Sequence, residues 1–278
     1  MPHPAPQAAE ALADDIVARM AEPLPLSGGE RLPCSCSIGI AAFPGDTPAI
    51  DILLSHADSA MYEAKRRGRG AWHRYSAELS ERLQRKMLLR QALGQALADG
   101  ALTLACQPQL TLADQRLTGV ELLLRWRHPQ LGEVPPEQFV PLAEESGLIR
   151  PIGDWVLAEA CRLAVRWNAG RAAPLVVAVN VSPRQFGGVD LAARVAELLA
   201  ASGCRAEWLQ IEITEGLLID DPQAVQATLQ ALSALGVTIA IDDFGSGHSA
   251  LGYLQRFAVD VLKIDRSFVQ PVLDGERH

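Results

Sequence analysis

The sequence predicts an α/β fold whose larger part is an incomplete βα barrel with one antiparallel strand. Three observations predict it. Short apolar strands alternate with helical segments after residue 100, polar residues recur inside these strands, and only a short loop joins the first two strands. The 278 residues are 49% hydrophobic and 21% charged, so the apolar content is sufficient for a sizeable core.

Residues 1–75 form the first predicted region, a partial α+β segment. From Cys34 the stretch CSCSIGIAAFPGD is typical of an apolar strand that ends at a Pro-Gly turn. The following TPAIDILLSHADSAMYEAKRRGRG has apolar residues at helical spacing, and Gly68 and Gly70 end the helix. Basic residues in its last turn complement the helix dipole, which favours a solvated helix end over a phosphate site; they are Lys65, Arg66, Arg67 and Arg69.

Residues 76–100 are predicted to form an amphipathic helix that leads into the larger region, residues 101–278. Six strands are predicted there: LTLACQPQL, LTGVELLLRW, LVVAVNVS, LQIEITE, VTIAIDDFG and VDVLKIDRSFV. The first two should be antiparallel, because a parallel crossover needs a dozen or more residues. Polar anchors follow at steps of 32, 30 and 21 positions, typical of successive βαβ units; they are Asn180, Glu212, Asp242 and Lys263.

Polar residues inside apolar strands are costly to bury unless they are satisfied, so their repetition indicates one shared site. In a closed barrel they converge at the C-terminal mouth. The hard oxygen donors suit magnesium, manganese or calcium; they are Glu121, Asn180, Glu212, Asp242 and Asp243. The adjacent carboxylates Asp242 and Asp243 repel each other unless cations lie near them. The pattern therefore predicts divalent cations, with one aspartate on each or the second bridging a pair.

Ordered motifs carry a resemblance to a known family. Residues from about 88 to 272 resemble an EAL domain, the cyclic-di-GMP phosphodiesterase family. The matching pieces are QP at Gln107, ELLLRW at Glu121, FVPLAEESGLI from Phe139, NVSPRQF at Asn180, EITE at Glu212, DDFGSGHSAL at Asp242 and KIDRSFV at Lys263. Residues 10–75 resemble the C-terminal part of a GGDEF domain through SIGIAAFPGD and ADSAMYEAKRRGRG.

The resemblance implies a TIM-like barrel and two-metal hydrolysis of cyclic-di-GMP to linear pGpG with Mg²⁺ or Mn²⁺. It implies ligands to one metal at Glu121, Asn180, Glu212 and Asp242, with Asp243 on the second. Lys263 would position or activate the attacking water, in a catalytic centre shared with Glu121. Substrate or metal-bound water would be contacted by Gln107, Arg125 and Asp265. A structural ion pair between Lys263 and an interior acid is the alternative.

Three other functions stay open: a non-catalytic cyclic-di-GMP receptor, an inactive fragment, and a different metal-dependent barrel enzyme. Leu122 replaces the family's alanine beside the retained Glu121. His248 and Ala250 depart from the glycine loop through which the resemblance implies a homodimer. Residues 88–278 number 191, against roughly 250 in a typical barrel of this class. The sequence is thus predicted to be a fragment, cut at both ends, of a tandem GGDEF-EAL protein.

The composition limits the partners and the location. A net charge of -8 argues against binding of DNA or RNA polymers, because no basic surplus neutralises a phosphate backbone. The N-terminus lacks the pattern of a signal peptide, and no apolar run approaches the roughly 18 residues that span a bilayer. Five cysteines without a disulfide framework favour a reducing cytoplasm. Cyclase activity is not expected, because the GGDEF signature itself is absent.

Overall fold

The computed structural model describes residues 6–27, 30–186, 190–220, 222–245 and 257–273. The chain divides into two compact units, Met1–Leu89 and Arg90–His278, each described by itself. The elements that begin in the first unit are α1 (Pro6–Met20), β1 (Leu24–Pro25), β2 (Arg31–Leu32), β3 (Ser37–Ile40), α2 (Ile50–Arg66), β4 (Ala71–Arg74) and α3 (Ala77–Ala96).

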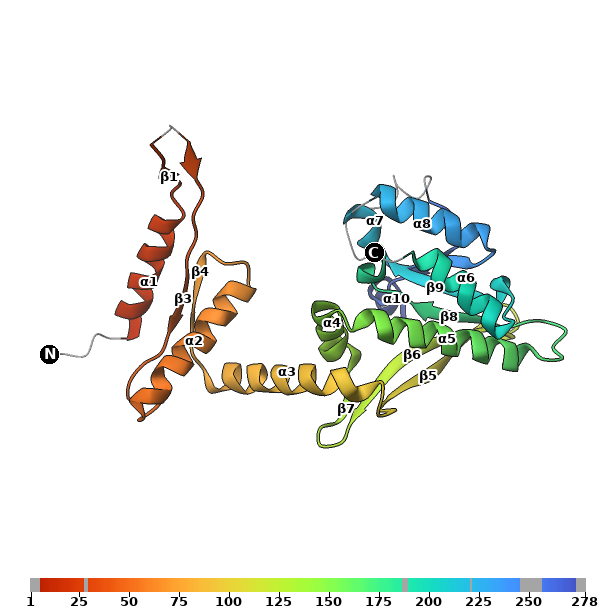
Figure 1. Ribbon diagram of the computed structural model, residues 1–278, viewed down its shortest axis with the longest axis horizontal. Helices are drawn as coiled ribbons and strands as arrows, with labels where there is room; N and C mark the ends of the chain where they lie inside the picture. Colours follow the sequence, from red (N-terminus) through yellow and green to blue (C-terminus); the bar gives the residue numbers. More distant parts are fainter. Residues whose placement is uncertain (1–5, 28–29, 187–189, 221, 246–256, 274–278) are drawn as a thin grey trace. The chain divides into compact units, whose positions relative to one another are not determined.

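The first unit is built on a parallel pair of strands, β3 and β4, against which α2 packs (Figure 1). Gly39 lies so close to α2 that a Cβ atom there would stand 1.9 Å from the carbonyl oxygen of Ala57. A small core joins Ala60 of α2 to Leu79 and Leu83 of α3. The predicted strand and both predicted helices are therefore present.

The second unit alternates strands with helices. Its elements are β5 (Leu102–Leu110), β6 (Leu117–His128), β7 (Gly132–Val134), α4 (Pro136–Ser146), α5 (Ile149–Asn168), β8 (Val176–Asn180), η1 (Pro183–Gln185), α6 (Leu191–Ser202), η2 (Ala206–Trp208), β9 (Leu209–Thr214), α7 (Leu217–Asp220), α8 (Pro222–Ala234), β10 (Thr238–Phe244), β11 (Val261–Ile264) and α10 (Arg266–Leu273).

These strands form one seven-stranded sheet in the order β11-β10-β9-β8-β6-β5, with β7 paired to β6. β5 and β6 are antiparallel, whereas β6, β8, β9, β10 and β11 follow one another in parallel. Both predictions about strand direction are confirmed. Over the described ranges the sheet does not close into a complete barrel, in agreement with the incomplete barrel that the sequence predicts.

The core lies where the central parallel strands meet the helices that connect them. Helices α5, α6 and α8 follow the strands along one side of the sheet (Figure 1). Val177, Ile211 and Ile239 on one face of the sheet are each 0% exposed, and so are Ala178 and Ala240 on the other face, as expected for parallel strands covered on both faces. No helix in the described parts of the chain is long and apolar enough to cross a membrane.

Candidate active site

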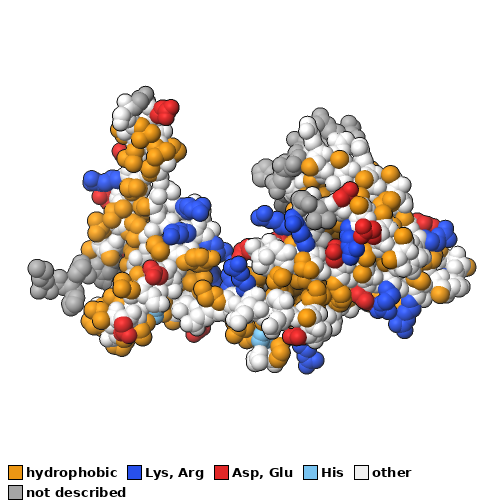
Figure 2. Space-filling view, viewed as in Figure 1, with side chains coloured by type: hydrophobic (Ala, Val, Ile, Leu, Met, Phe, Trp, Pro, Cys, Tyr) orange, Lys and Arg blue, Asp and Glu red, His pale blue; other side chains and the backbone are white. Residues whose placement is uncertain are grey.

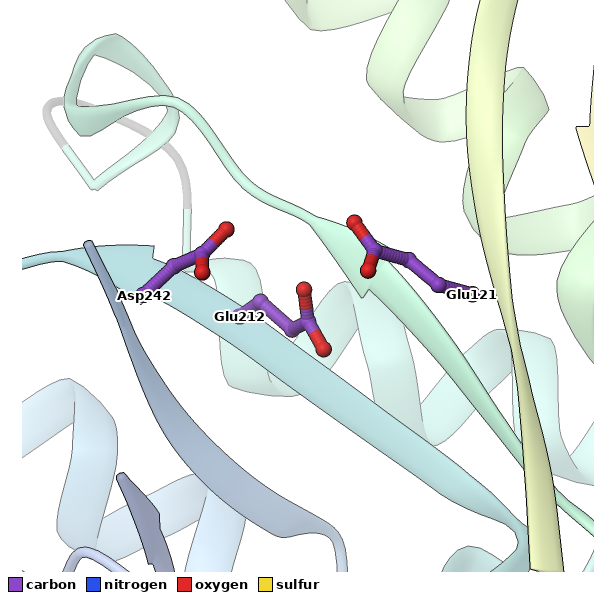
Figure 3. A group of neighbouring side chains, drawn as sticks. All are labelled: Glu121, Glu212 and Asp242. Carbon is purple, nitrogen blue, oxygen red and sulfur yellow. The ribbon is translucent and has the colours of Figure 1, made fainter. Parts of the chain in front are cut away.

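Three carboxylates from three strands meet at one end of the parallel sheet. They are Glu121 of β6, Glu212 of β9 and Asp242 of β10, and one oxygen of each lies within 4.8 Å of the others. Figure 3 shows the three carboxyl groups pointing toward one another. Glu212 is 0% exposed, so its charge depends on its neighbours rather than on water.

The local sequence explains this convergence. Side chains on a strand alternate between its two faces, so the strand LQIEIT directs Glu212 to one face and its isoleucines to the other. The β8–β9 register sets Asn180 directly opposite Glu212. Asn180 Nδ2 donates a hydrogen bond of 2.8 Å to Glu121 Oε1. The parallel pairing thus brings into one place residues far apart in the sequence.

Lys263 of β11 supplies the positive charge at the centre of this group. Its Nζ lies 3.0 Å from Glu121 Oε2 and 3.1 Å from Asp242 Oδ1, and it also forms an ion pair with Glu212. We call Glu121, Glu212, Asp242 and Lys263 the carboxylate cluster. It contains three formal negative charges and one positive charge, so it retains an excess of negative charge in a partly enclosed place.

The pKa values in the cluster reflect this imbalance. Burial raises the pKa of Glu212, and the hydrogen bond from Lys263 only partly opposes that effect. Burial also works against the charged form of Lys263. The hydrogen bond to Glu212 and the attraction of the surrounding acids outweigh it, so the pKa of Lys263 is raised. The ammonium therefore stays charged and holds the acids together.

Asp243 and Asp265 form a second acidic group beside the cluster. Asp243 has a φ of 53°, a left-handed conformation that aspartate tolerates better than most residues. Its side chain makes a hydrogen bond with Asp265. Burial, followed by repulsion from Asp242, raises the pKa of Asp243, whereas hydrogen bonds from Ser267 lower the pKa of Asp265. Asp242 and Asp243 thus belong to two different acidic groups.

The donor set fits a hard divalent cation. Carboxylate and amide oxygens are the ligands that Mg²⁺ and Mn²⁺ take in proteins, and each cluster carboxylate directs an oxygen inward. The negative excess of the cluster is the electrostatic condition for such an ion. Asn180 at the end of the neighbouring strand β8 and Asp243 near the end of β10 extend the set.

Two predicted substrate contacts, Gln107 and Arg125, lie outside the carboxylate cluster. Gln107 is exposed on β5, opposite Glu121 in the antiparallel register. Arg125 donates a hydrogen bond of 3.0 Å to the carbonyl of Leu124. Arg125 also lines a cavity of about 300 Å³, mostly apolar, together with Asn180 and Glu212. Of the carboxylate cluster, Glu212 lines this cavity together with Arg125.

Supporting residues were missed by the sequence analysis. Gln210 is buried and donates a hydrogen bond of 3.0 Å to Glu212 Oε1. The sequence pattern could have indicated Gln210, because it stands two residues before Glu212 and therefore lies on the same face of the strand. Ser182 donates to Glu144 of α4 over 2.6 Å and caps η1 in a reciprocal pair with Gln185. These bonds fix the loop that follows Asn180.

Comparisons with known proteins identify the families that this chain resembles. Residues 90–278 match the EAL domain family, and residues 1–71 match the diguanylate cyclase, GGDEF domain. A signaling protein of Caulobacter vibrioides is 40% identical over 272 residues, which are 98% of this chain and 33% of that protein. The bifunctional diguanylate cyclase/cyclic di-GMP phosphodiesterase MucR of Pseudomonas aeruginosa is 42% identical over 264 residues, 95% of this chain and 38% of MucR.

Among solved structures, the MucR phosphodiesterase in complex with c-di-GMP superposes with a TM-score of 0.64 and 44% identity. The match covers 67% of this chain and 75% of that chain. By contrast, the chain spans only 33% and 38% of the lengths of the two curated relatives. The sequence match to these two relatives extends over nearly all of this chain, 98% and 95% of it.

Proposed function

We propose that this chain, which belongs to the EAL domain family, hydrolyses one phosphodiester of cyclic di-GMP to give linear pGpG. The observation that carries the proposal is the convergence of Glu121, Glu212 and Asp242 beside a cavity lined by Arg125. The name of MucR and its complex with c-di-GMP support the choice of substrate. The activity belongs to the hydrolases.

The proposal includes a division of the chain into three parts. Residues 1–75 would be the C-terminal part of a GGDEF-like domain, residues 76–100 a connecting helix with the start of the EAL domain, and residues 101–278 the EAL domain. The matches over residues 1–71 and 90–278 support this division.

The cations would be Mg²⁺ or Mn²⁺. One would be held by Glu121, Asn180, Glu212 and Asp242, and Asp243 would serve a second. When bound, such ions supply Lewis-acid activation of water and of the phosphoryl oxygens. The hydrogen bond from Asn180 to Glu121 supports this arrangement, because it fixes the orientation of a carboxylate that would hold the ion.

Side chains of this chain would bind the substrate and position the attacking water. Arg125 would bind a phosphate through its planar fork, with the neighbouring cavity enclosing part of the nucleotide. Lys263 would donate a hydrogen bond to the attacking water or to the phosphoryl oxygen. Gln107 and Asp265 would contact substrate or ordered water at the rim. With divalent cations bound, the negative excess of the cluster would be compensated, and Arg125 and Lys263 would then complement an anionic substrate.

Assembly and location stay predictions. A homodimer through the EAL domain is proposed by resemblance, and the loop residues His248 and Ala250 lie outside the described parts of the chain. The cytoplasmic location also rests on the sequence alone.

The test is to incubate the purified chain with cyclic di-GMP and Mn²⁺ and to separate the products by chromatography. We expect pGpG from the parent chain. Glu121→Gln should lower the rate by about 10³-fold, because it removes a charged ligand worth several kcal/mol of transition-state stabilisation. Glu133→Gln, an exposed substitution on β7, is the matched control and should retain the parent rate.

The outcomes separate the alternatives. Binding of cyclic di-GMP without turnover, unchanged by Glu121→Gln, would favour a receptor over an enzyme. Turnover that survives Glu121→Gln would reject the proposed centre. A chain that neither binds nor hydrolyses cyclic di-GMP would contradict the proposed substrate.

A further inference from the structure

The position of Lys263 raises a question about how a cation enters the site. Lys263 pairs with every carboxylate of the cluster at once: Glu121, Glu212 and Asp242. Its side chain is 23% exposed, so most of it is enclosed with the acids. An ammonium in contact with three carboxylates occupies the place that the same carboxylates offer to a metal.

The hydrogen bonds of Glu121 and Glu212 identify the carboxylate oxygens for which Lys263 and a metal would compete. The Oε1 atom of Glu121 accepts from Asn180, and the Oε1 atom of Glu212 accepts from Gln210. Lys263 takes the other oxygen of each, at Glu121 Oε2 and Glu212 Oε2. Neutral amides thus engage one oxygen of each glutamate, and the ammonium engages the other oxygen of each.

Electrostatics favours an exchange of occupants. Three acids this close together repel one another, and one monovalent ammonium leaves the repulsion partly uncompensated. A divalent cation compensates more charge at the same oxygens and needs them as ligands. The ammonium and the metal repel each other, so they cannot both keep contact with Glu121 Oε2 and Glu212 Oε2.

We propose that Lys263 and a divalent cation are alternative occupants of the carboxylate cluster, so that metal loading drives the ammonium out of its contacts with Glu121, Glu212 and Asp242. The inference rests on the proposed function. The released ammonium is then a donor for the anionic substrate, which gives one side chain two successive roles. In the metal-free chain Lys263 keeps the acids assembled, and after loading it faces the phosphate.

The first test measures metal affinity and not turnover. Lys263→Met removes the competing charge from a side chain of similar length. We expect Mn²⁺ to bind the variant at least about tenfold more tightly in calorimetric titration, because the metal no longer displaces a bound cation. Lys65→Met, an exposed substitution in the first unit, removes the same charge and should leave the affinity unchanged. An affinity of Lys263→Met equal to or weaker than the parent's would overturn the proposal.

A second measurement uses the unaltered chain, in case Lys263→Met does not fold. The sequence holds three lysines, Lys65, Lys86 and Lys263. Acylation with an N-hydroxysuccinimide ester, followed by mass spectrometry of the peptides, reports each one separately. We expect Mg²⁺ to raise the labelling rate of Lys263 several-fold and to leave Lys65 and Lys86 unchanged. A Lys263 rate that stays constant or falls with Mg²⁺ would contradict the release.

The results distinguish this inference from the proposed function. If the parent and Lys263→Met both fail to bind Mn²⁺, the metal centre is wrong and both proposals fail. If both bind Mn²⁺ equally well, only the competition is wrong, and the phosphodiesterase assay stands on its own. If the variant alone binds Mn²⁺, metal loading does not displace the ammonium in the parent chain, and both the exchange of occupants and the metal-dependent function fail.

Discussion

Each unit of the chain holds an ionic cluster built around one central charge, and these two clusters have opposite compositions. In the first unit a single buried carboxylate, that of Glu63, is surrounded by three guanidinium groups: those of Arg66, Arg67 and Arg82. In the second unit a single ammonium, that of Lys263, is surrounded by three carboxylates: those of Glu121, Glu212 and Asp242. The first cluster has a positive excess of two charges and the second a negative excess of two.

The two clusters differ in how well water solvates their excess charge. The side chains of the three arginines are between 45% and 57% exposed, so water solvates their positive charge. Lys and Arg side chains gather on the visible face of the first unit near the end of α2 (Figure 2). The three acids of the second cluster are at most 22% exposed. Their excess charge is poorly solvated, and a bound cation is the physical means of compensating it.

The pKa values of Glu63 and Glu212 show the same difference between the two clusters. The hydrogen bond from Arg66 holds the pKa of Glu63 at about 2 although burial opposes it, so this carboxylate gains from its surroundings. Burial raises the pKa of Glu212, so the charged form of that carboxylate is disfavoured in its surroundings. The charged form of Glu63 is therefore stabilised by its surroundings, whereas the charged form of Glu212 is disfavoured.

The largest difference is expected when each cluster loses one carboxylate through the same change, glutamate to glutamine. Glu212→Gln should lower Mn²⁺ affinity and kcat/KM for cyclic di-GMP by about 10³-fold, because a neutral amide is a weaker ligand. It should not lower the free energy of unfolding of the metal-free second unit, because the raised pKa shows that the charge is disfavoured there. Titration calorimetry and denaturant unfolding measure these two effects. A large loss of stability with unchanged metal affinity would reverse the assignment of the clusters.

Glu63→Gln should have the opposite signature. We expect the first unit to lose about 3 kcal/mol of unfolding free energy, because the three arginines lose their buried partner. Metal affinity should not change. Hydrogen exchange of peptides from α2 and α3 measures the loss, with Asp58→Asn, an exposed change on α2, as the control.

The pH dependence supplies a second check on Glu63. A depressed carboxylate pKa adds stability that is fully present above the unfolded value of 4.5 and is lost as the pH falls toward about 2. The stability difference between the parent and Glu63→Gln should therefore shrink across this window. A difference that is constant from pH 5 to pH 2 would show that the carboxylate's charge is not what stabilises the unit.

Sequence patterns predicted the second cluster because its members violate a simple rule. Glu121, Glu212 and Asp242 stand out as charged residues within apolar strands, and the period of two places each on the face opposite its apolar neighbours. The direction of β5 followed from loop length alone. Leu122 is 2% exposed, in keeping with a packing variation beside Glu121.

The arrangement around these residues could not be predicted in the same way. The last turn of α2 was interpreted as solvated basic residues, whereas Arg66 and Arg67 also bind Glu63, and Arg82 reaches it from 19 positions along the chain. The place of Lys263 among acids from three other strands depends on the order and curvature of the sheet. No local pattern encodes contacts that are set by tertiary packing.

The smallest effect is expected from Gln210, which orients Glu212 without joining the carboxylate cluster. Gln210→Met keeps the size of this buried side chain but removes the donor to Glu212 Oε1. We expect about a tenfold loss of Mn²⁺ affinity, since partners that orient a ligand have effects of this size. Gln230→Met, an exposed change on α8, is the control.

If Gln210→Met binds Mn²⁺ as tightly as the parent, the ion pairs of the cluster alone orient Glu212. If the loss matches that of Glu212→Gln, the amide is as important as the charge, and the contrast between the two clusters depends on hydrogen bonding as much as on electrostatic excess.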